Sequence, residues 1–167
     1  MKEGTYLSEG HHRLRMVELA VSDIPGFTFS DVELVRKGMT YTVDTLRQML
    51  DDSLDPDEVF LLLGADAYAS FERWKEPAEI LRLCTLAVSS RPGGPEPGFE
   101  KLDALLPRGS HRAVSVPVQQ LEISSSDIRE RAQSRLSLRE CVPAAVEAYI
   151  HENQLYSDTS ALDAKRG

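Results

Sequence analysis

The stretch Val59-Phe60-Leu61-Leu62-Leu63-Gly64 decides the fold class of this chain of 167 residues. A short, continuous apolar run that ends at a glycine is typical of a parallel strand buried on both faces, so we expect it near the centre of a sheet. Three other segments have strand patterns. They are residues 27–35, in which apolar and polar residues alternate with a phase slip near Asp31, residues 85–89 and residues 113–118.

Helical periodicity separates these strands. Thr42 can cap a helix with an inward apolar stripe, and Pro77 suits the first turn of another. The inward residues of the first are Val43, Leu46, Met49 and Leu50, and further helices are expected over residues 8–23 and 99–106, from Pro77, from Ser124 and from Pro143. Alternating strands and helices predict an α/β fold whose mostly parallel sheet binds ligands at the carboxyl ends of its strands.

Composition and charge fit one globular domain over residues 1–156, followed by a polar tail, 157–167, that we expect to be disordered. The chain is 41% hydrophobic and 28% charged, and its 19 Lys and Arg against 27 Asp and Glu give a net charge of −8. This balance argues against binding to nucleic acid or to an anionic membrane surface. It is compatible with a small phosphate ligand.

Neither a membrane span nor a signal peptide is expected from the sequence. The longest apolar run, 59–63, is far shorter than the ~20 residues of a membrane helix, and the first residues have no apolar stretch. Cys84 and Cys141 lack CxxC or metal-ligand spacing, which favours free thiols in a reducing compartment. We therefore expect a cytoplasmic protein.

The motif Ile123-Ser124-Ser125-Ser126-Asp127-Ile128-Arg129 follows a strand pattern and opens a helix. Ser124 and Asp127 have the spacing of a capping box, so one interpretation is that the serines only satisfy free helix amides. The other is a cradle for a phosphate chain, because hydroxyls, amides at the positive helix end and Arg129 together suit an anion. The spacing alone leaves both interpretations open.

Two more features have both a functional and a structural interpretation. Gly64-Ala65-Asp66 follows the 59–63 strand, where a glycine lets a ligand approach the backbone and Asp66 offers an acceptor, although Gly and Asp are also common in turns. Trp74, the single tryptophan, lies among charged neighbours. Its indole is either a stacking platform for an aromatic ring or half-buried over the sheet.

Metal-dependent and serine-triad chemistry find no support in the sequence. The four histidines show no metal-ligand spacing with carboxylates, and the chain has no Gly-x-Ser-x-Gly motif. We therefore expect no resident metal site and no serine triad.

Several segments, taken in order, resemble bacterial nicotinate-nucleotide adenylyltransferase of the nucleotidyltransferase superfamily. They are His12-Arg13-x-x-Met16-x-x-x-Ala20, Thr40-Tyr41-Thr42-Val43-Asp44-Thr45-Leu46, Gly64-Ala65-Asp66 with Trp74, Val88-x-x-Arg91-Pro92-Gly93, the serine motif 123–129, and Val146-x-x-Tyr149-Ile150 with Leu155-Tyr156. The match spans nearly the whole chain, and the ordered set is more specific than any single motif. The resemblance implies a Rossmann-like, doubly wound sheet.

The resemblance also implies the reaction and its site. AMP would pass from ATP, with Mg²⁺, to nicotinate mononucleotide, giving the dinucleotide and pyrophosphate by in-line displacement without a protein nucleophile. The residues that it assigns to the ATP phosphates are Ser124, Ser125, Ser126 and Arg129, with Arg91 as an additional contact. Those that it assigns to the nicotinate nucleotide are Tyr41, Thr42, Asp66, Trp74 and Lys75.

One departure concerns the amino-terminal end. The family begins with a glycine-rich turn and a His-x-Gly-His motif that holds the α-phosphate, and His11-His12 lacks that spacing. The sequence thus resembles the family without its first βαβ unit, and no catalytic residue is assigned. Either Met1 is internal to a longer reading frame, or the chain is a shortened relative with little activity.

Two further alternatives concern function. The first is a non-catalytic nucleotide-binding or interaction remnant of the same superfamily. The second is an adenylyltransferase for another nucleotide, such as nicotinamide mononucleotide.

Overall fold

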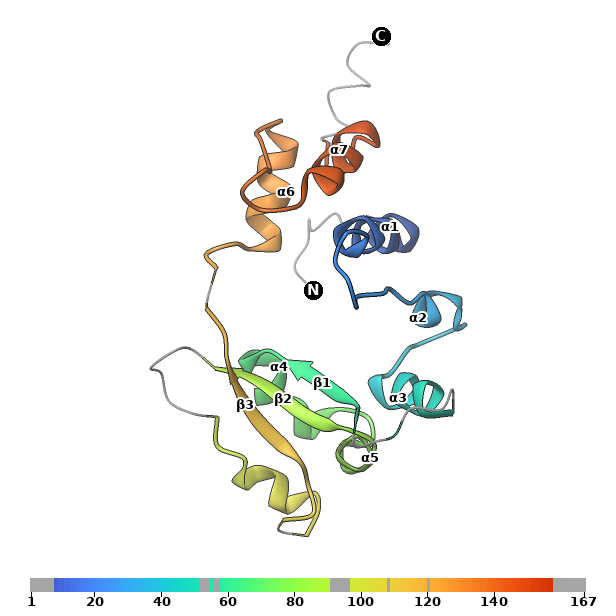
Figure 1. Cartoon of the computed structure of the whole chain (residues 1–167), viewed down its shortest axis with the longest axis vertical. Helices are drawn as coiled ribbons and strands as arrows, with labels where there is room; N and C mark the ends of the chain where they lie inside the picture. The colour runs from blue at the N-terminus through green and yellow to red at the C-terminus, as the bar shows by residue number, and fades with distance from the viewer. Residues whose placement is uncertain are drawn as a thin grey trace. The chain divides into compact units, whose positions relative to one another are not determined.

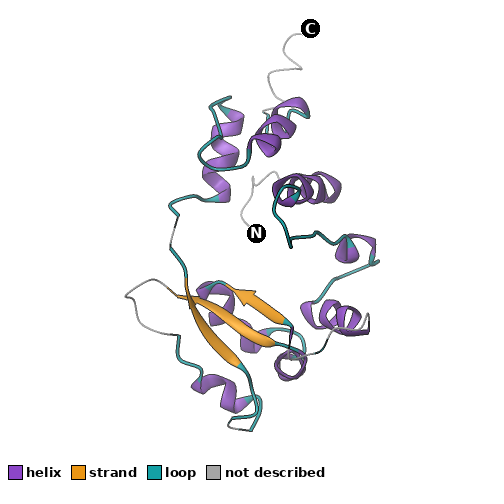
Figure 2. Ribbon diagram, in the orientation of Figure 1, coloured by secondary structure: helices purple, strands orange, loops and turns teal. Residues whose placement is uncertain are grey.

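The computed structural model describes residues 8–51, 55, 58–90, 97–107, 109–119 and 121–157. They belong to two compact units, which we describe separately (Figure 1). Residues 36–121 form the sheet unit, and the segments before residue 36 and after residue 121 form the helical unit. Figure 2 shows all the described strands in the sheet unit. A single domain over residues 1–156 stays a prediction, and all of the expected tail except Ser157 lies outside the described residues.

The sheet unit contains a three-stranded parallel sheet in the order β1-β2-β3. The strands are β1 (Phe60–Leu63), β2 (Thr85–Ser90) and β3 (Ala113–Pro117). In the central strand β2, Leu86 and Val88 are completely buried. Leu86 pairs with Leu61 of β1 and with Ala113 of β3. The α/β class with a parallel sheet is therefore confirmed.

The expectation that the 59–63 run is buried on both faces is wrong for this structure. Phe60 is 57% exposed and Leu62 75% exposed, whereas Leu63 is buried. The reason is that β1 has a strand neighbour on only one side among the described residues, so one of its faces stays largely uncovered. The strand that is buried on both faces is β2 instead.

Within the described residues, five short helices accompany the sheet: α3 (Thr42–Asp51), α4 (Ala65–Ala69), η2 (Phe71–Arg73), α5 (Pro77–Leu83) and η3 (Glu100–Ala104). Their apolar side chains join the strands in one core. On α3, Val43 and Leu46 are buried as expected, but Met49 is 41% exposed. Since successive helical residues are rotated by about 100°, Met49 lies about 120° away from Val43, outside the inward stripe.

The strand expected over residues 27–35 is wrong. Residues 32–35 form the short helix α2 (Val32–Val35), and the residues before it have no regular structure. Phe27 is 66% exposed, and Phe29 is also exposed. A strand needs a neighbour for its backbone amides and carbonyls, and none of the described strands pairs with this segment.

The helical unit packs three longer helices, α1 (Gly10–Val21), α6 (Ser125–Gln133) and α7 (Ala144–Glu152). Its core joins buried Ala132, Leu138, Val146 and Ile150 to partly buried side chains that include Met16, Leu19, Ala20 and Ile128. His12 Nδ1 lies 2.8 Å from the Tyr149 hydroxyl and so links α1 to α7. These helices confirm the expectations for the two ends of the chain. None of the helices in the described ranges is long and apolar enough to cross a membrane.

Candidate functional site

The residues that the resemblance assigns to the ATP phosphates lie at the start of α6. This phosphate-side group consists of Ser124, Ser125, Ser126 and Arg129. Ser124 precedes the helix, and its Oγ accepts a hydrogen bond from the backbone N–H of Asp127 at 3.1 Å. The capping interpretation of this serine is therefore confirmed. Ser124, Ser125 and Ser126 are all exposed. Three exposed hydroxyl-bearing residues therefore lie at the positive end of α6, where an anion is favoured.

Arg129 turns back toward this helix start. Its Nη2 donates a hydrogen bond to Ser126 Oγ at 3.2 Å, and the side chain is half-buried. A surface ion pair with Asp127 or Glu130 would be the simplest structural role for this guanidinium. The structure of residues 121–157 contains neither ion pair. The arginine thus brings positive charge to the serine hydroxyls without an internal carboxylate partner.

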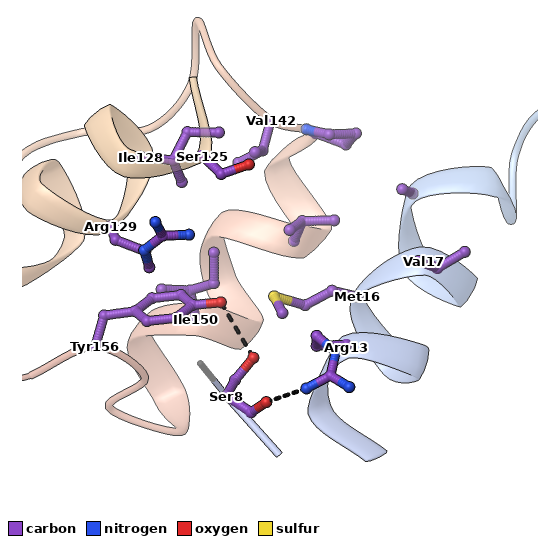
Figure 3. Close-up of a pocket in the computed structure, with 13 residues that line it drawn as sticks. Ser8, Arg13, Met16, Val17, Ser125, Ile128, Arg129, Val142, Ile150 and Tyr156 are labelled. Carbon is purple, nitrogen blue, oxygen red and sulfur yellow. Dashed lines mark hydrogen bonds between the residues drawn. The ribbon is translucent and has the colours of Figure 1, made fainter. Parts of the chain in front are cut away.

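A pocket of about 400 Å³ lies within the helical unit beside this group. Figure 3 shows its lining, with Arg129 and Ser125 from α6 and Arg13 and Met16 from α1. The remaining lining residues are mainly apolar: Val17, Ala20, Ile128, Val142, Pro143, Val146 and Ile150, with Ser8 and Tyr156 at the same pocket. A cavity with apolar walls and two guanidinium groups suits an amphiphilic anion.

The residues that the resemblance assigns to the nicotinate nucleotide lie in the sheet unit. This nicotinate-side group consists of Tyr41, Thr42, Asp66, Trp74 and Lys75, and Lys75 makes most of its contacts. The Lys75 Nζ atom lies 2.9 Å from Asp44 Oδ2, 3.3 Å from Asp44 Oδ1 and 4.5 Å from the centroid of the Tyr41 ring. Tyr41 is exposed immediately before α3, and Thr42 is the half-buried first residue of that helix. The fold thus brings together Tyr41 and Lys75, 34 residues apart, at the start of α3.

Trp74, the residue before Lys75, lies on the surface of the core. Its ring centroid is 5.5 Å from that of fully buried Phe71, at an interplanar angle of 53°. The indole is partly buried against the core, so one side is packed and part of it remains accessible. This position is compatible both with a stacking platform and with a half-buried structural residue.

Gly64 and Asp66 lie where β1 ends and α4 begins (Figure 1). Gly64 has an ordinary φ of −71°, and a Cβ added to it would meet no heavy atom within 4 Å. Neither backbone conformation nor packing within the described chain therefore requires a glycine there. Asp66 is exposed in the first turn of α4 and has no ion-pair partner among the described residues. Arg91, the last expected phosphate contact, lies outside the described residues.

Two observations on the described part of the chain concern metal ions and the Cys84 thiol. No group of three or more His, Cys, Asp or Glu residues there could hold a metal ion. Burial raises the pKa of Cys84 to about 11, which keeps this thiol protonated and unreactive.

Sequence reasoning missed several charged residues around these two groups. Asp44 and Arg47, one turn apart on α3, contact the residues that follow Trp74, and Arg13 lines the pocket of the helical unit. The spacing of Asp44 and Arg47 on one helix face was visible in the sequence. Their partners lie about 30 residues away, and only the fold reveals them.

The fold agrees with comparisons to known proteins. The family described as Cytidylyltransferase-like matches residues 2–131. Two solved structures of Plasmodium falciparum nicotinic acid mononucleotide adenylyltransferase share the fold. The one complexed with APC has a TM-score of 0.64 at 20% identity over 90% of this chain and 77% of that one. The one complexed with NaAD has a TM-score of 0.65 at 19% identity over 93% and 78%. The class is thus that of the cytidylyltransferase-like proteins with a Rossmann-like fold.

Sequence relatives define the branch within this class. A probable nicotinate-nucleotide adenylyltransferase from Dehalococcoides mccartyi is 38% identical over 150 residues, which cover 90% of this chain and 74% of the relative. One from Geotalea uraniireducens is 39% identical over 164 residues, 87% of this chain and 74% of the relative. The chain belongs to the nicotinate-nucleotide adenylyltransferase family.

Proposed function

We propose that this protein takes part in NAD biosynthesis by transferring AMP from ATP to nicotinate mononucleotide, with pyrophosphate as the second product. The observation that carries the proposal is the direction of Arg129, whose guanidinium turns back to Ser126 at the exposed start of α6. A cap needs no cation there, and the helix dipole slightly disfavours one. An anionic ligand explains the arrangement, and the family relatives favour a nucleotide triphosphate.

The phosphate chain of ATP would interact with the serines and the arginines. Ser125 and Ser126 hydroxyls and the first amides of α6 donate hydrogen bonds to its oxygens, and Arg129 supplies a charge-assisted bond. Arg91 is proposed as an additional contact. Because displacement at phosphorus depends mainly on positioning and charge neutralisation, these donors are the chain's main contribution on the ATP side.

The nicotinate nucleotide would bind in the sheet unit. The Trp74 indole stacks on the pyridine ring, and the Lys75 ammonium attracts an anionic group of the nucleotide. Tyr41 and Thr42 supply hydroxyls at the start of α3. Asp66 accepts a hydrogen bond from the nucleotide, and the open space beside Gly64 lets the ligand approach the backbone.

Mg²⁺ would enter with ATP, as part of the substrate. The described residues contain no set of three metal-ligating side chains, so they do not fit a resident metal site. The triphosphate oxygens are the natural ligands of this hard cation. We propose a cytoplasmic location, where ATP and the reduced state of both cysteines are maintained.

A second candidate, that the 167-residue chain by itself binds nucleotides with little catalysis, is favoured by one observation. The 167 residues contain no His-x-Gly-His motif, which the family resemblance assigns to the α-phosphate. Each donor that stabilises a transition state contributes roughly 3 kcal/mol, so its absence lowers the rate by about two orders of magnitude or more.

Binding and turnover of the same protein test these proposals. We expect the 167-residue chain to bind both ATP and nicotinate mononucleotide in calorimetric titrations, and to release pyrophosphate very slowly. Fusing to the amino-terminal end of this chain a strand–helix unit with the His-x-Gly-His motif that the family resemblance implies should raise the rate. No binding of either nucleotide would contradict the proposed reaction. Pyrophosphate release at ordinary enzyme rates by the unfused chain would contradict the second candidate.

A further inference from the structure

The segment Trp74–Glu76 is attached to the sheet unit at three points. The Trp74 ring packs on buried Phe71, as described above. Lys75 forms its two short contacts with the Asp44 carboxylate of α3. Glu76 Oε2 accepts a hydrogen bond from Arg47 Nη2 at 2.6 Å, and the second oxygen lies 3.5 Å from Nη1. Each residue of the segment therefore has its own partner.

The backbone of this segment needs such attachment. Glu76 has φ 50° and ψ 55°, in the left-handed region, and immediately precedes Pro77, the first residue of α5. A residue before proline favours extended backbone, and a non-glycine residue at positive φ is uncommon. Such conformations persist where surrounding contacts hold them, and they often occur beside ligand-binding residues.

The partners on α3 form one connected ionic network. Arg47 Nη1 lies 3.7 Å from Asp44 Oδ1, and Arg47 Nη2 lies 3.8 Å from Glu79 Oε1, in addition to the contact with Glu76. The Arg47 hydrogen bond holds the pKa of Glu76 below its ordinary value, so this carboxylate stays ionised. Asp44 and Arg47, one turn apart, thus connect α3 to Lys75 and Glu76 at once.

Global stability is a weak explanation for this network. Its side chains are partly exposed, and exposed ion pairs contribute little to the free energy of folding. Its location is more informative, because the network includes Lys75 and the residue after it, and Trp74 immediately precedes them in the chain. Trp74 and Lys75 are the two residues proposed to contact the nicotinate nucleotide. A segment held in one geometry binds a ligand without first paying the entropy of ordering.

We propose that Asp44 and Arg47 are positioning residues that hold the Trp74–Glu76 segment in the conformation that binds the nicotinate nucleotide. Arg47 fixes the strained turn at Glu76, and Asp44 fixes the Lys75 ammonium over the Tyr41 ring. In this proposal, neither the Asp44 carboxylate nor the Arg47 guanidinium contacts the nucleotide. The proposal rests on the proposed function for its ligand, but the attachment of the segment is a property of the free protein.

Trp74 allows a direct test, because it is the single tryptophan of the chain. Acrylamide quenching of its fluorescence in the ligand-free 167-residue protein reports the order of the segment, and titration with nicotinate mononucleotide reports binding. The variants are R47Q, D44N and the conservative R47K. The matched control is R82Q, which removes an ion pair of Glu79 but leaves Asp44, Arg47 and their contacts with the segment in place.

We expect R47Q and D44N to raise the quenching constant and to weaken nicotinate mononucleotide binding by roughly threefold to fivefold. R47K should recover part of both effects, and R82Q should match the parent protein. ATP affinity and the midpoint of thermal unfolding should be unchanged in all four variants, which separates positioning from a merely structural role.

Unchanged quenching and unchanged nucleotide affinity in R47Q and D44N would overturn the proposal, and so would altered quenching with unchanged affinity. If the parent protein does not bind nicotinate mononucleotide, the proposed function fails. The quenching measurements in the ligand-free protein would then still decide whether Asp44 and Arg47 hold the segment.

Discussion

The candidate residues of the two units are held in place by different kinds of contact. In the sheet unit, Lys75 and Trp74 already contact Asp44, Tyr41 and Phe71. In the helical unit, the serines at the start of α6 are exposed, and Arg129 is held by one hydrogen bond to Ser126. The nicotinate-side residues are thus held by contacts between residues far apart in the sequence, whereas the phosphate-side residues are held by contacts within the first turn of α6. We infer that substitutions of residues that do not contact the ligand weaken ligand binding more on the nicotinate side than on the phosphate side.

Core substitutions give the largest expected effects and test this contrast directly. Phe71 and Leu138 are fully buried, one in each unit. Phe71→Ala should destabilise the protein by about 3–5 kcal/mol and Leu138→Ala by about 2–5 kcal/mol, because each leaves a cavity. Phe71→Ala should also shift the Trp74 emission of the native state more than Leu138→Ala does, because the Phe71 ring packs on the Trp74 ring. Urea unfolding followed by circular dichroism and by fluorescence measures both effects, and an equal emission shift in the two variants would contradict the contrast.

Substitution of Arg129 gives the next largest effect. Arg129→Ala should weaken ATP binding by about 1.5–3 kcal/mol, the size of a hydrogen bond to a charged group, and Arg129→Lys should fall between it and the parent. Calorimetric titration with ATP measures the series. The control is Arg131→Ala on the same helix, where Arg131 Nε donates to the Ser137 carbonyl at 3.3 Å and does not line the pocket. Equal ATP affinity in all variants would show that Arg129 is only a surface residue.

Removal of the Trp74 indole has a smaller, ligand-selective effect. Trp74→Ala should weaken nicotinate mononucleotide binding by ~1–2 kcal/mol and leave ATP affinity nearly unchanged, because stacking involves only the pyridine ring. Trp74→Phe should retain part of the binding. Titration with each nucleotide separates the two ligands, and the nucleotide should quench Trp74 fluorescence in the parent. Equal losses for both ligands, with a lower melting temperature, would instead assign Trp74 a structural role.

Glu147 gives the smallest effect, confined to acidic pH. The Glu147 Oε1 atom accepts hydrogen bonds from the Leu138 backbone N–H at 2.7 Å and from Ser137 Oγ at 3.1 Å. These bonds, chiefly that of Leu138, hold the pKa of Glu147 below its ordinary value. A lowered pKa in the folded state stabilises the protein above the unfolded pKa, and this contribution is lost as the pH falls through the folded pKa.

Glu147→Gln keeps an acceptor but removes the charge. Its melting temperature should therefore fall less than that of the parent between about pH 5 and pH 3, the range around an ordinary Glu pKa. Thermal unfolding by circular dichroism at several pH values measures the difference. Parallel curves for both proteins would mean that Glu147 does not contribute to the acid sensitivity of the helical unit.

Local sequence patterns correctly predicted helices that are fixed by their own caps and strands that have a neighbouring strand to pair with. Pro77 begins α5, Ser124 caps α6, and the 85–89 run is the buried strand β2, because capping geometry and apolar periodicity act over a few residues. The alternation over residues 27–35 failed as a predictor, since a strand also depends on a neighbour that the pattern does not contain.

The sequence by itself determined the α/β class, the helix starts and the residue types of the candidate site. Those features follow from hydrophobic periodicity, capping and the ordered family motifs, which are properties of short stretches. Only the tertiary structure decided that Lys75 meets Asp44 and Tyr41, that Arg47 holds Glu76 at positive φ, and that Phe60 and Leu62 remain exposed. Such contacts join residues about 30 positions apart, and burial depends on neighbouring elements, so no local pattern specifies them.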